Sequence, residues 1–264
     1  MSISIDYRST WLHQLNPSLK LLTLASLFIG LLFIHNPNFL FYVIIGSLVL
    51  YLFSTGHSWK LLCLLALPLF IIFISSATTM IFFGDGEHTW FKWGIIHITE
   101  ESFYRGIHLG LRSCVFGLLS LLFALTTRPV QLFYSTMQQL KIKPKYAYSF
   151  MAAIRMLPII LEEFQSLRRA LKVRGVQYTK GIKGIYEKIK LYAIPLLAQS
   201  IRRAHRIAVA MEAKQFSRNE QRTFYYQLSY SVKDILFLAL LAGWLFLSYL
   251  GSSSFAIFPV DYVR

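Results

Sequence analysis

Five stretches of the chain are apolar at nearly every position. Four lie in the first half and one near the end, and they cover residues 19–34, 39–53, 61–83, 106–125 and 232–250. Polar turns separate them, and continuous apolar runs of this length are typical of transmembrane helices. The second run, at about fifteen residues, is short for a hydrocarbon layer of ~30 Å. The pattern predicts an all-α, polytopic membrane protein with about five transmembrane helices.

Between the fourth and fifth apolar runs the hydrophobic positions recur every three or four residues instead. A short amphipathic helix is expected over residues 130–140, and two long ones over 146–174 and 183–214. Pro158 and Pro195 are expected to bend the long helices or to mark the end of a preceding short one. Each long helix carries one apolar stripe, formed by Leu157, Ile160, Phe164, Leu167 and Leu171 in the first and by Leu197, Ile201, Ala204, Ala208 and Met211 in the second.

Both stripes run into a basic residue. The first continues to Arg174, and Gly175 follows as a typical helix stop. The second ends at Lys214 and Gln215. Two helices alone make a marginal core, so these stripes need membrane, partner proteins or both. The charged ends are suited to grooves in a soluble partner, where an arginine can pair with a carboxylate.

Composition and charge fit this division of the chain. Hydrophobic residues make up 55% of it, and nearly all of the net charge of +15 lies in residues 128–231, with nineteen Lys and Arg against five Asp and Glu. A basic excess beside membrane spans predicts a cytoplasmic segment that contacts anionic lipid. No nucleic-acid-binding motif accompanies it, so nucleic acid is not expected as a partner.

The charge pattern also predicts domains and orientation. The loop of residues 84–105 is acidic, with Asp85, Glu87, Glu100 and Glu101, and is expected outside the cell. We therefore expect a membrane domain of four spans over residues 1–127, a cytoplasmic domain of amphipathic helices over 128–231, and a last span with a short external tail over 232–264. The N-terminus would be cytoplasmic.

The sequence offers little chemistry for a catalytic or metal site. It contains no CxxC, HExxH or phosphate-binding loop, and His97 and His108 lack a third ligand nearby, so neither metal nor cofactor is expected. Arg105, His108 and Arg112 share one face of the fourth span. They either snorkel and satisfy helix contacts, which we favour, or contact a partner membrane subunit.

Several different short motifs lie at the borders of these elements. They are Leu15-Asn16-Pro17-Ser18-Leu19-Lys20 before the first span, Thr126-Thr127-Arg128-Pro129 and Leu140-Lys141-Ile142-Lys143-Pro144 at the entry to the basic segment, the run from Leu157-Pro158 through Glu162-Glu163 to Arg174-Gly175, and Arg202-Arg203-Ala204 with Ala210 to Phe216 and Arg222-Thr223. Over nearly its whole length the chain thus resembles the transmembrane coupling component of energy-coupling factor transporters.

In that family each long helix ends in an Ala-Arg-Gly signature that docks an ATPase. The corresponding residues here are Val173, Arg174 and Gly175, and Ala213, Lys214 and Gln215. Lysine keeps the charge but lacks the bidentate fork of arginine, and glutamine is expected to remove the helix stop that glycine provides. The resemblance therefore implies two docking contacts of unequal strength.

The resemblance also implies the partners and the activity. The chain would be a non-catalytic transport subunit in the plasma membrane of a prokaryote, with two cytoplasmic ABC ATPase subunits or one fused ATPase. One small substrate-binding membrane subunit would rest on the ten stripe residues and tilt when ATP binding closes the ATPases. Substrate choice belongs to that subunit in the family, so a vitamin, a vitamin precursor such as a thiamine precursor, or a metal ion is compatible.

Two other classes of protein are compatible with the residues alone. A membrane-embedded enzyme would need converging acids, histidines or a nucleophile at membrane depth, and Arg112 is the only strongly charged residue well inside a span. A membrane-anchored scaffold would need only the basic segment. Co-purification separates these readings, since a coupling subunit brings an ATPase pair and a small membrane protein.

Overall fold

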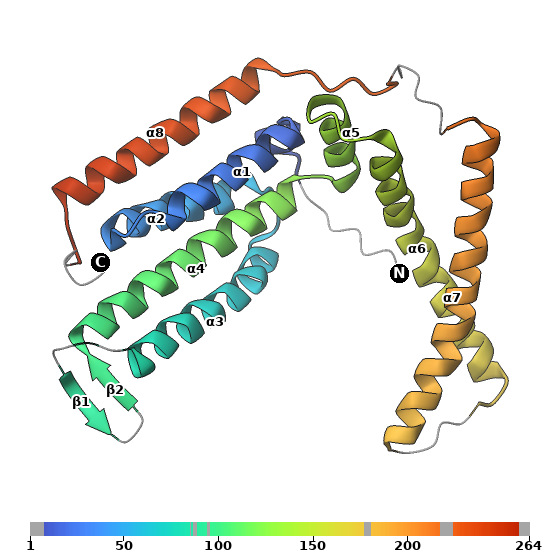
Figure 1. Cartoon of the computed structure of the whole chain (residues 1–264), viewed down its shortest axis with the longest axis horizontal. Coiled ribbons are helices and arrows are strands. Elements are labelled where there is room, and N and C mark those ends of the chain that lie inside the picture. The colour runs from blue at the N-terminus through green and yellow to red at the C-terminus, as the bar shows by residue number, and fades with distance from the viewer. Residues whose placement is uncertain are drawn as a thin grey trace. The chain divides into compact units, whose positions relative to one another are not determined.

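The computed structural model describes residues 8–84, 86, 89–93, 96–176, 181–216 and 224–258. They belong to two compact units (Figure 1). The membrane unit runs to Ser135 and resumes at Leu228, and the arm unit covers Thr136–Gln227. The expected boundary at Arg128 lies seven residues before Ser135, and Ser135 is tied to the membrane unit by its hydroxyl, which donates to the Asn16 side-chain oxygen.

The membrane unit is built from helices, as predicted. Four of them have the length and hydropathy to cross a bilayer: α2 (Pro37–Ser54), α3 (Trp59–Phe83), α4 (Glu100–Thr126) and α8 (Val232–Ser254). The predicted first span is the shorter α1 (Pro17–Leu32), whose 16 residues extend about 24 Å. An all-α polytopic fold is confirmed, and the residues that the structure describes include four apolar helices of full length and a fifth, shorter one.

Helix α4 is the centre of the membrane unit and packs against α1, α2 and α3 (Figure 1). Its contact with α3 depends on small residues: a Cβ built on Gly106 would lie 2.8 Å from the Ala77 carbonyl oxygen, and one on Gly110 would lie 3.0 Å from the Phe73 ring. Gly106 and Gly110 form a G-x-x-x-G pair, the spacing that lets membrane helices approach closely. On the other side Val115 packs with residues of α1 and α2 in the main core.

The loop before α4 contains an element that the hydrophobic pattern did not predict. Strands β1 (Thr89–Trp93) and β2 (Ile96–Thr99) form an antiparallel hairpin. Helix α4 then begins at Glu100 rather than at residue 106, because Thr99 and Ser102 form a reciprocal capping box. Asp85 and Glu87, two of the four acidic residues of the loop expected outside the cell, lie outside the described residues.

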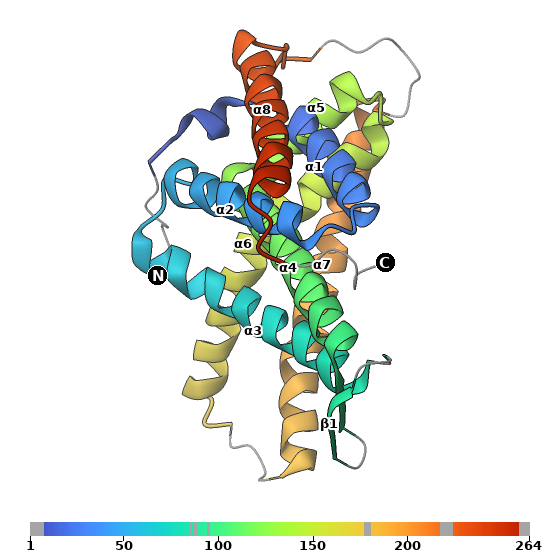
Figure 2. The same ribbon diagram turned by 90° about the vertical axis from the view of Figure 1, so that its left-hand side faces the viewer.

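The two long amphipathic helices are present within a few residues of their predicted bounds. After α5 (Pro129–Gln139), α6 covers Pro144–Val173 and α7 covers Ile182–Ala213. Both remain helical through their internal prolines, Pro158 and Pro195, so neither proline ends a helix. Figure 2 shows α6 and α7 separating toward the ends where the first stops and the second begins.

Candidate functional site

The end of α6 has the geometry of a Schellman motif. Gly175 takes a left-handed conformation with φ of 66°. Its N–H donates to the Lys172 carbonyl at 3.1 Å, and the Val176 N–H donates to the Leu171 carbonyl at 3.3 Å. Arg174 is the helix-capping residue, and its side chain is exposed. We call Val173, Arg174 and Gly175 the first tip.

The end of α7 has the same geometry with different residues. Gln215 takes the left-handed conformation, with φ of 54°, and its N–H donates to the Glu212 carbonyl at 2.8 Å. The Phe216 N–H donates to the Met211 carbonyl at 3.0 Å. The expectation that glutamine would remove the helix stop is therefore wrong, because the two hydrogen bonds hold it where glycine normally sits. We call Ala213, Lys214 and Gln215 the second tip.

The two tips differ in the residue that follows them. Val176 lies beside Lys172 of its own helix, at the edge of a groove between α6 and α7. Phe216 instead packs edge-on against Tyr148 near the start of α6, with ring centroids 5.1 Å apart. The second tip is thus braced by the other long helix.

Helices α6 and α7 are joined by polar and aromatic contacts away from the tips. The Arg203 guanidinium pairs with the Glu163 carboxylate, and both side chains are about three-quarters buried. A second contact joins the same two helices through the Phe164 and Tyr192 rings, whose centroids lie 5.2 Å apart. Each capping cation lies eleven residues beyond its own member of the ion pair, a helical distance of about 16 Å.

The predicted apolar stripes are only partly exposed. Leu157, Leu197 and Ile201 are the large exposed members, with 59 to 68% of their surface accessible, whereas Leu171 is buried. The structure adds Leu161 and Ile194 to the exposed set, both missed by the stripe pattern. Exposed apolar side chains at this density are typical of a surface that contacts lipid or another protein. The remaining stripe residues, Ile160, Phe164, Leu167, Ala204, Ala208 and Met211, range from half-buried to exposed.

A buried polar network, which the sequence did not predict, links the starts of α1 and α8 to α5. The Asp234 carboxylate accepts the N–H groups of Asn16 at 2.9 Å and Ser231 at 2.8 Å. The Asn16 side-chain oxygen accepts the hydroxyl of Ser135 at 2.5 Å, and Ser18 donates to the same oxygen. Three segments distant in sequence are thereby tied together. The only hint of this network in the sequence is Asp234, an acidic residue at the start of an otherwise apolar helix.

Two further charged or titratable groups lie near this network. Lys20 is buried and its Nζ donates to the Thr126 carbonyl at 3.0 Å, which satisfies the C-terminal end of α4. His13 belongs to a short 3-10 helix, Trp11–Gln14, and its Nδ1 accepts the Thr10 N–H at 3.2 Å. Burial, followed by the nearby charge of Lys20, lowers the pKa of His13 below 6.5.

The polar residues of α4 are also engaged within the membrane unit. Arg112 donates to the Ile34 carbonyl at 2.8 Å, and the His108 ring stacks on His35 with centroids 6.4 Å apart. Both contacts are with the turn between α1 and α2, which agrees with the interpretation that Arg112 and His108 contact neighbouring parts of this chain. Among the described residues no group of three His, Cys, Asp or Glu side chains is placed to hold a metal ion.

Comparisons with known proteins agree with this architecture. Residues 8–225 match the family described as cobalt transport protein, CbiQ. The chain is 28% identical to the energy-coupling factor transporter transmembrane protein EcfT of Listeria innocua, covering 90% of this chain and 94% of that protein. It is 28% identical to the protein of the same name from Thermotoga maritima (90% and 89% covered) and 29% identical to that from Bacillus subtilis (89% and 92%).

Proposed function

The chain belongs to the cobalt transport protein family, and from that premise we propose that it is the transmembrane coupling component of an energy-coupling factor importer. In this role it catalyses nothing itself, and ATP is hydrolysed by partner subunits. The relatives named as transmembrane proteins of such transporters align along nearly their full length, which supports the same role for the whole chain.

The observation that carries the proposal is the equivalence of the two tips. Two helices end in the same hydrogen-bonded cap, and each places an exposed cation, Arg174 or Lys214, at the capping position. Such an end presents one positive charge on a rigid backbone, which suits a groove with a carboxylate. Each tip would dock one of two cytoplasmic ATPase subunits, or one half of a fused ATPase.

The exposed apolar residues of α6 and α7 would carry the small substrate-binding membrane subunit. Leu157, Leu161, Ile194, Leu197 and Ile201 form the surface that it would cover. When ATP binding draws the ATPases together, the docked tips would move with them, and the surface would tilt the subunit resting on it. The arm unit and the N-terminus would then face the cytoplasm of a prokaryotic cell.

Substrate choice would lie in that partner subunit rather than in this chain. The family description names cobalt, whereas the relatives' names give no substrate. A vitamin, a vitamin precursor such as a thiamine precursor, or a transition metal ion would therefore reach the cell through different small subunits.

Co-purification of the ATPases with tip variants tests the proposal. Arg174→Ala should lower ATPase retention more than Lys214→Ala, because arginine can pair with a carboxylate through two parallel hydrogen bonds and lysine cannot. Arg169→Ala and Arg206→Ala are the matched controls, since they remove exposed cations from the same two helices away from the tips.

The outcomes are distinct. Equal losses from the two tip variants would reject the asymmetry but keep the docking. Losses no larger than those of the Arg169 and Arg206 controls would reject docking at the tips. A chain that retains no ATPase in its wild-type form, yet shows activity on its own without ATP, would overturn the proposed function.

A further inference from the structure

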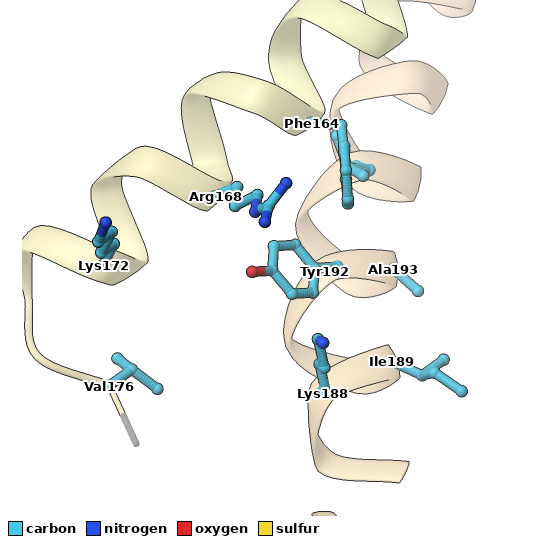
Figure 3. Close-up of a pocket in the computed structure, with 9 residues that line it drawn as sticks. Phe164, Arg168, Lys172, Val176, Lys188, Ile189, Tyr192 and Ala193 are labelled. Atoms are coloured by element: carbon cyan, nitrogen blue, oxygen red, sulfur yellow. The ribbon is translucent and has the colours of Figure 1, made fainter. Parts of the chain in front are cut away.

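A groove of about 760 Å³ lies where α6 and α7 separate, beyond the Phe164 and Tyr192 contact (Figure 3). Its cations come from both helices: Arg168 and Lys172 from α6, and Lys188 from α7. Figure 3 shows the Arg168 guanidinium and the Tyr192 hydroxyl both reaching into the space between the helices. The groove thus combines cations with an aromatic wall.

The charge of the groove has one sign. Among the described residues that line it three are cationic and none is acidic. Three cations around an aromatic wall favour a ligand with an anionic head and an apolar body.

The first turns of α7 extend the groove outward as an apolar stripe. Ile182, Ile185, Tyr186 and Ile189 follow helical spacing and expose 60 to 87% of their surface, and Ile189 also lines the groove. Lys183 and Lys190 flank the stripe and are exposed. Exposed isoleucines bordered by lysines are typical of a helix that lies in the surface of an anionic bilayer.

We propose that this groove binds the phosphate of an anionic phospholipid of the cytoplasmic leaflet. Arg168, Lys172 and Lys188 surround the phosphate beside the aromatic wall of Phe164 and Tyr192, and the apolar stripe of α7 enters the acyl region. An acidic segment of a soluble partner would use the cations but not the four exposed apolar side chains that lead out of the groove. The groove adjoins the first tip but uses none of the side chains of Val173, Arg174 or Gly175, and lipid binding there does not depend on ATPase docking.

Native mass spectrometry of the full-length chain in detergent tests the proposal, with phosphatidylglycerol as the probe and phosphatidylcholine as the neutral comparison. The test variant combines Arg168→Gln, Lys172→Gln and Lys188→Gln. A cation near an anionic lipid surface contributes enough for about a fivefold change in binding. The triple variant should therefore bind phosphatidylglycerol at least tenfold more weakly, with phosphatidylcholine binding unchanged.

The matched control removes three exposed cations of the same helices that lie away from the groove, Lys145, Arg155 and Arg206, each replaced by Gln. It should keep phosphatidylglycerol binding within about twofold of wild type. The charge-preserving variant Arg168→Lys, Lys172→Arg, Lys188→Arg should restore binding, and equal helix content by circular dichroism shows that each variant folds.

Two results would overturn the proposal. The first is an equal loss of phosphatidylglycerol in the groove variant and the control variant, which would reduce the effect to net charge. The second is unchanged phosphatidylglycerol binding in the groove variant. If that variant also loses ATPase retention, the groove would be assigned to an acidic segment of the ATPase instead.

Discussion

Replacing Gln215 with glycine should make the end of α7 more stable. A non-glycine residue in the left-handed conformation costs roughly 1 kcal/mol, and Gln215 is held there with φ of 54°. Glycine adopts that conformation without the steric cost, and the two capping hydrogen bonds use only backbone atoms, so both survive the change. The reverse change, Gly175→Ala, should weaken the end of α6 by a similar amount. A Cβ at Gly175 would meet none of the described atoms within 4 Å, so the cost there is conformational alone.

Amide hydrogen exchange on the full chain in detergent measures both effects where they occur. A change of about 1 kcal/mol corresponds to about a fivefold change in protection. Gln215→Gly should slow exchange at residues 215 and 216, and Gly175→Ala should speed exchange at residues 175 and 176. The two changes lie on different helices and should add in the double variant. Faster exchange in Gln215→Gly, or unchanged exchange in both variants, would refute the assignment of the caps.

Three other predictions concern the two units. Asp234→Asn leaves a buried oxygen to serve two backbone N–H groups and should destabilise the chain by about 1–3 kcal/mol, measured by denaturant unfolding in detergent; an unchanged midpoint would contradict the network. Because the folded state lowers the pKa of His13 below 6.5, its stabilising contribution is complete above pH 6.5 and is lost as the pH falls; His13→Gln should flatten the decline in stability as the pH falls below 6.5, and a parallel decline would contradict it. Glu163→Arg sets two cations against each other at a largely buried position and should destabilise the chain by at least about 1 kcal/mol in denaturant unfolding, and adding Arg203→Glu should restore most of the loss in a double-mutant cycle.

The helices were predictable because a bilayer leaves the backbone few choices. An apolar run of eighteen or more residues must satisfy its own N–H and C=O groups, and a helix does so. The stripes of α6 and α7 carried the same information through their spacing. The bounds of α6 and α7 agree with the sequence to within a few residues, since Pro144 begins one helix and a left-handed residue ends each.

The remaining features depend on contacts that no local pattern contains. Asn16 and Asp234 are far apart in sequence, and their hydrogen bond follows from how the helices pack. Strands β1 and β2 have only five and four residues, too few for an alternation of apolar and polar residues to predict them. Gln215 was misjudged because propensity assigns the left-handed position to glycine, while the hydrogen bonds to Glu212 and Met211 override that preference. The stripe pattern identified only some of the exposed apolar residues of α6 and α7. Which of them are buried depends on where the two helices contact each other.

The contact between Phe216 and Tyr148 gives the two tips different mechanical behaviour. Because Tyr148 belongs to α6, a displacement of the Lys214 end of α7 would be passed to α6 as well. Val176, the residue in the same place after the first tip, instead lines the groove between the two helices. If the tips dock as proposed, force on Lys214 would therefore reach both long helices, whereas force on Arg174 would act first on α6.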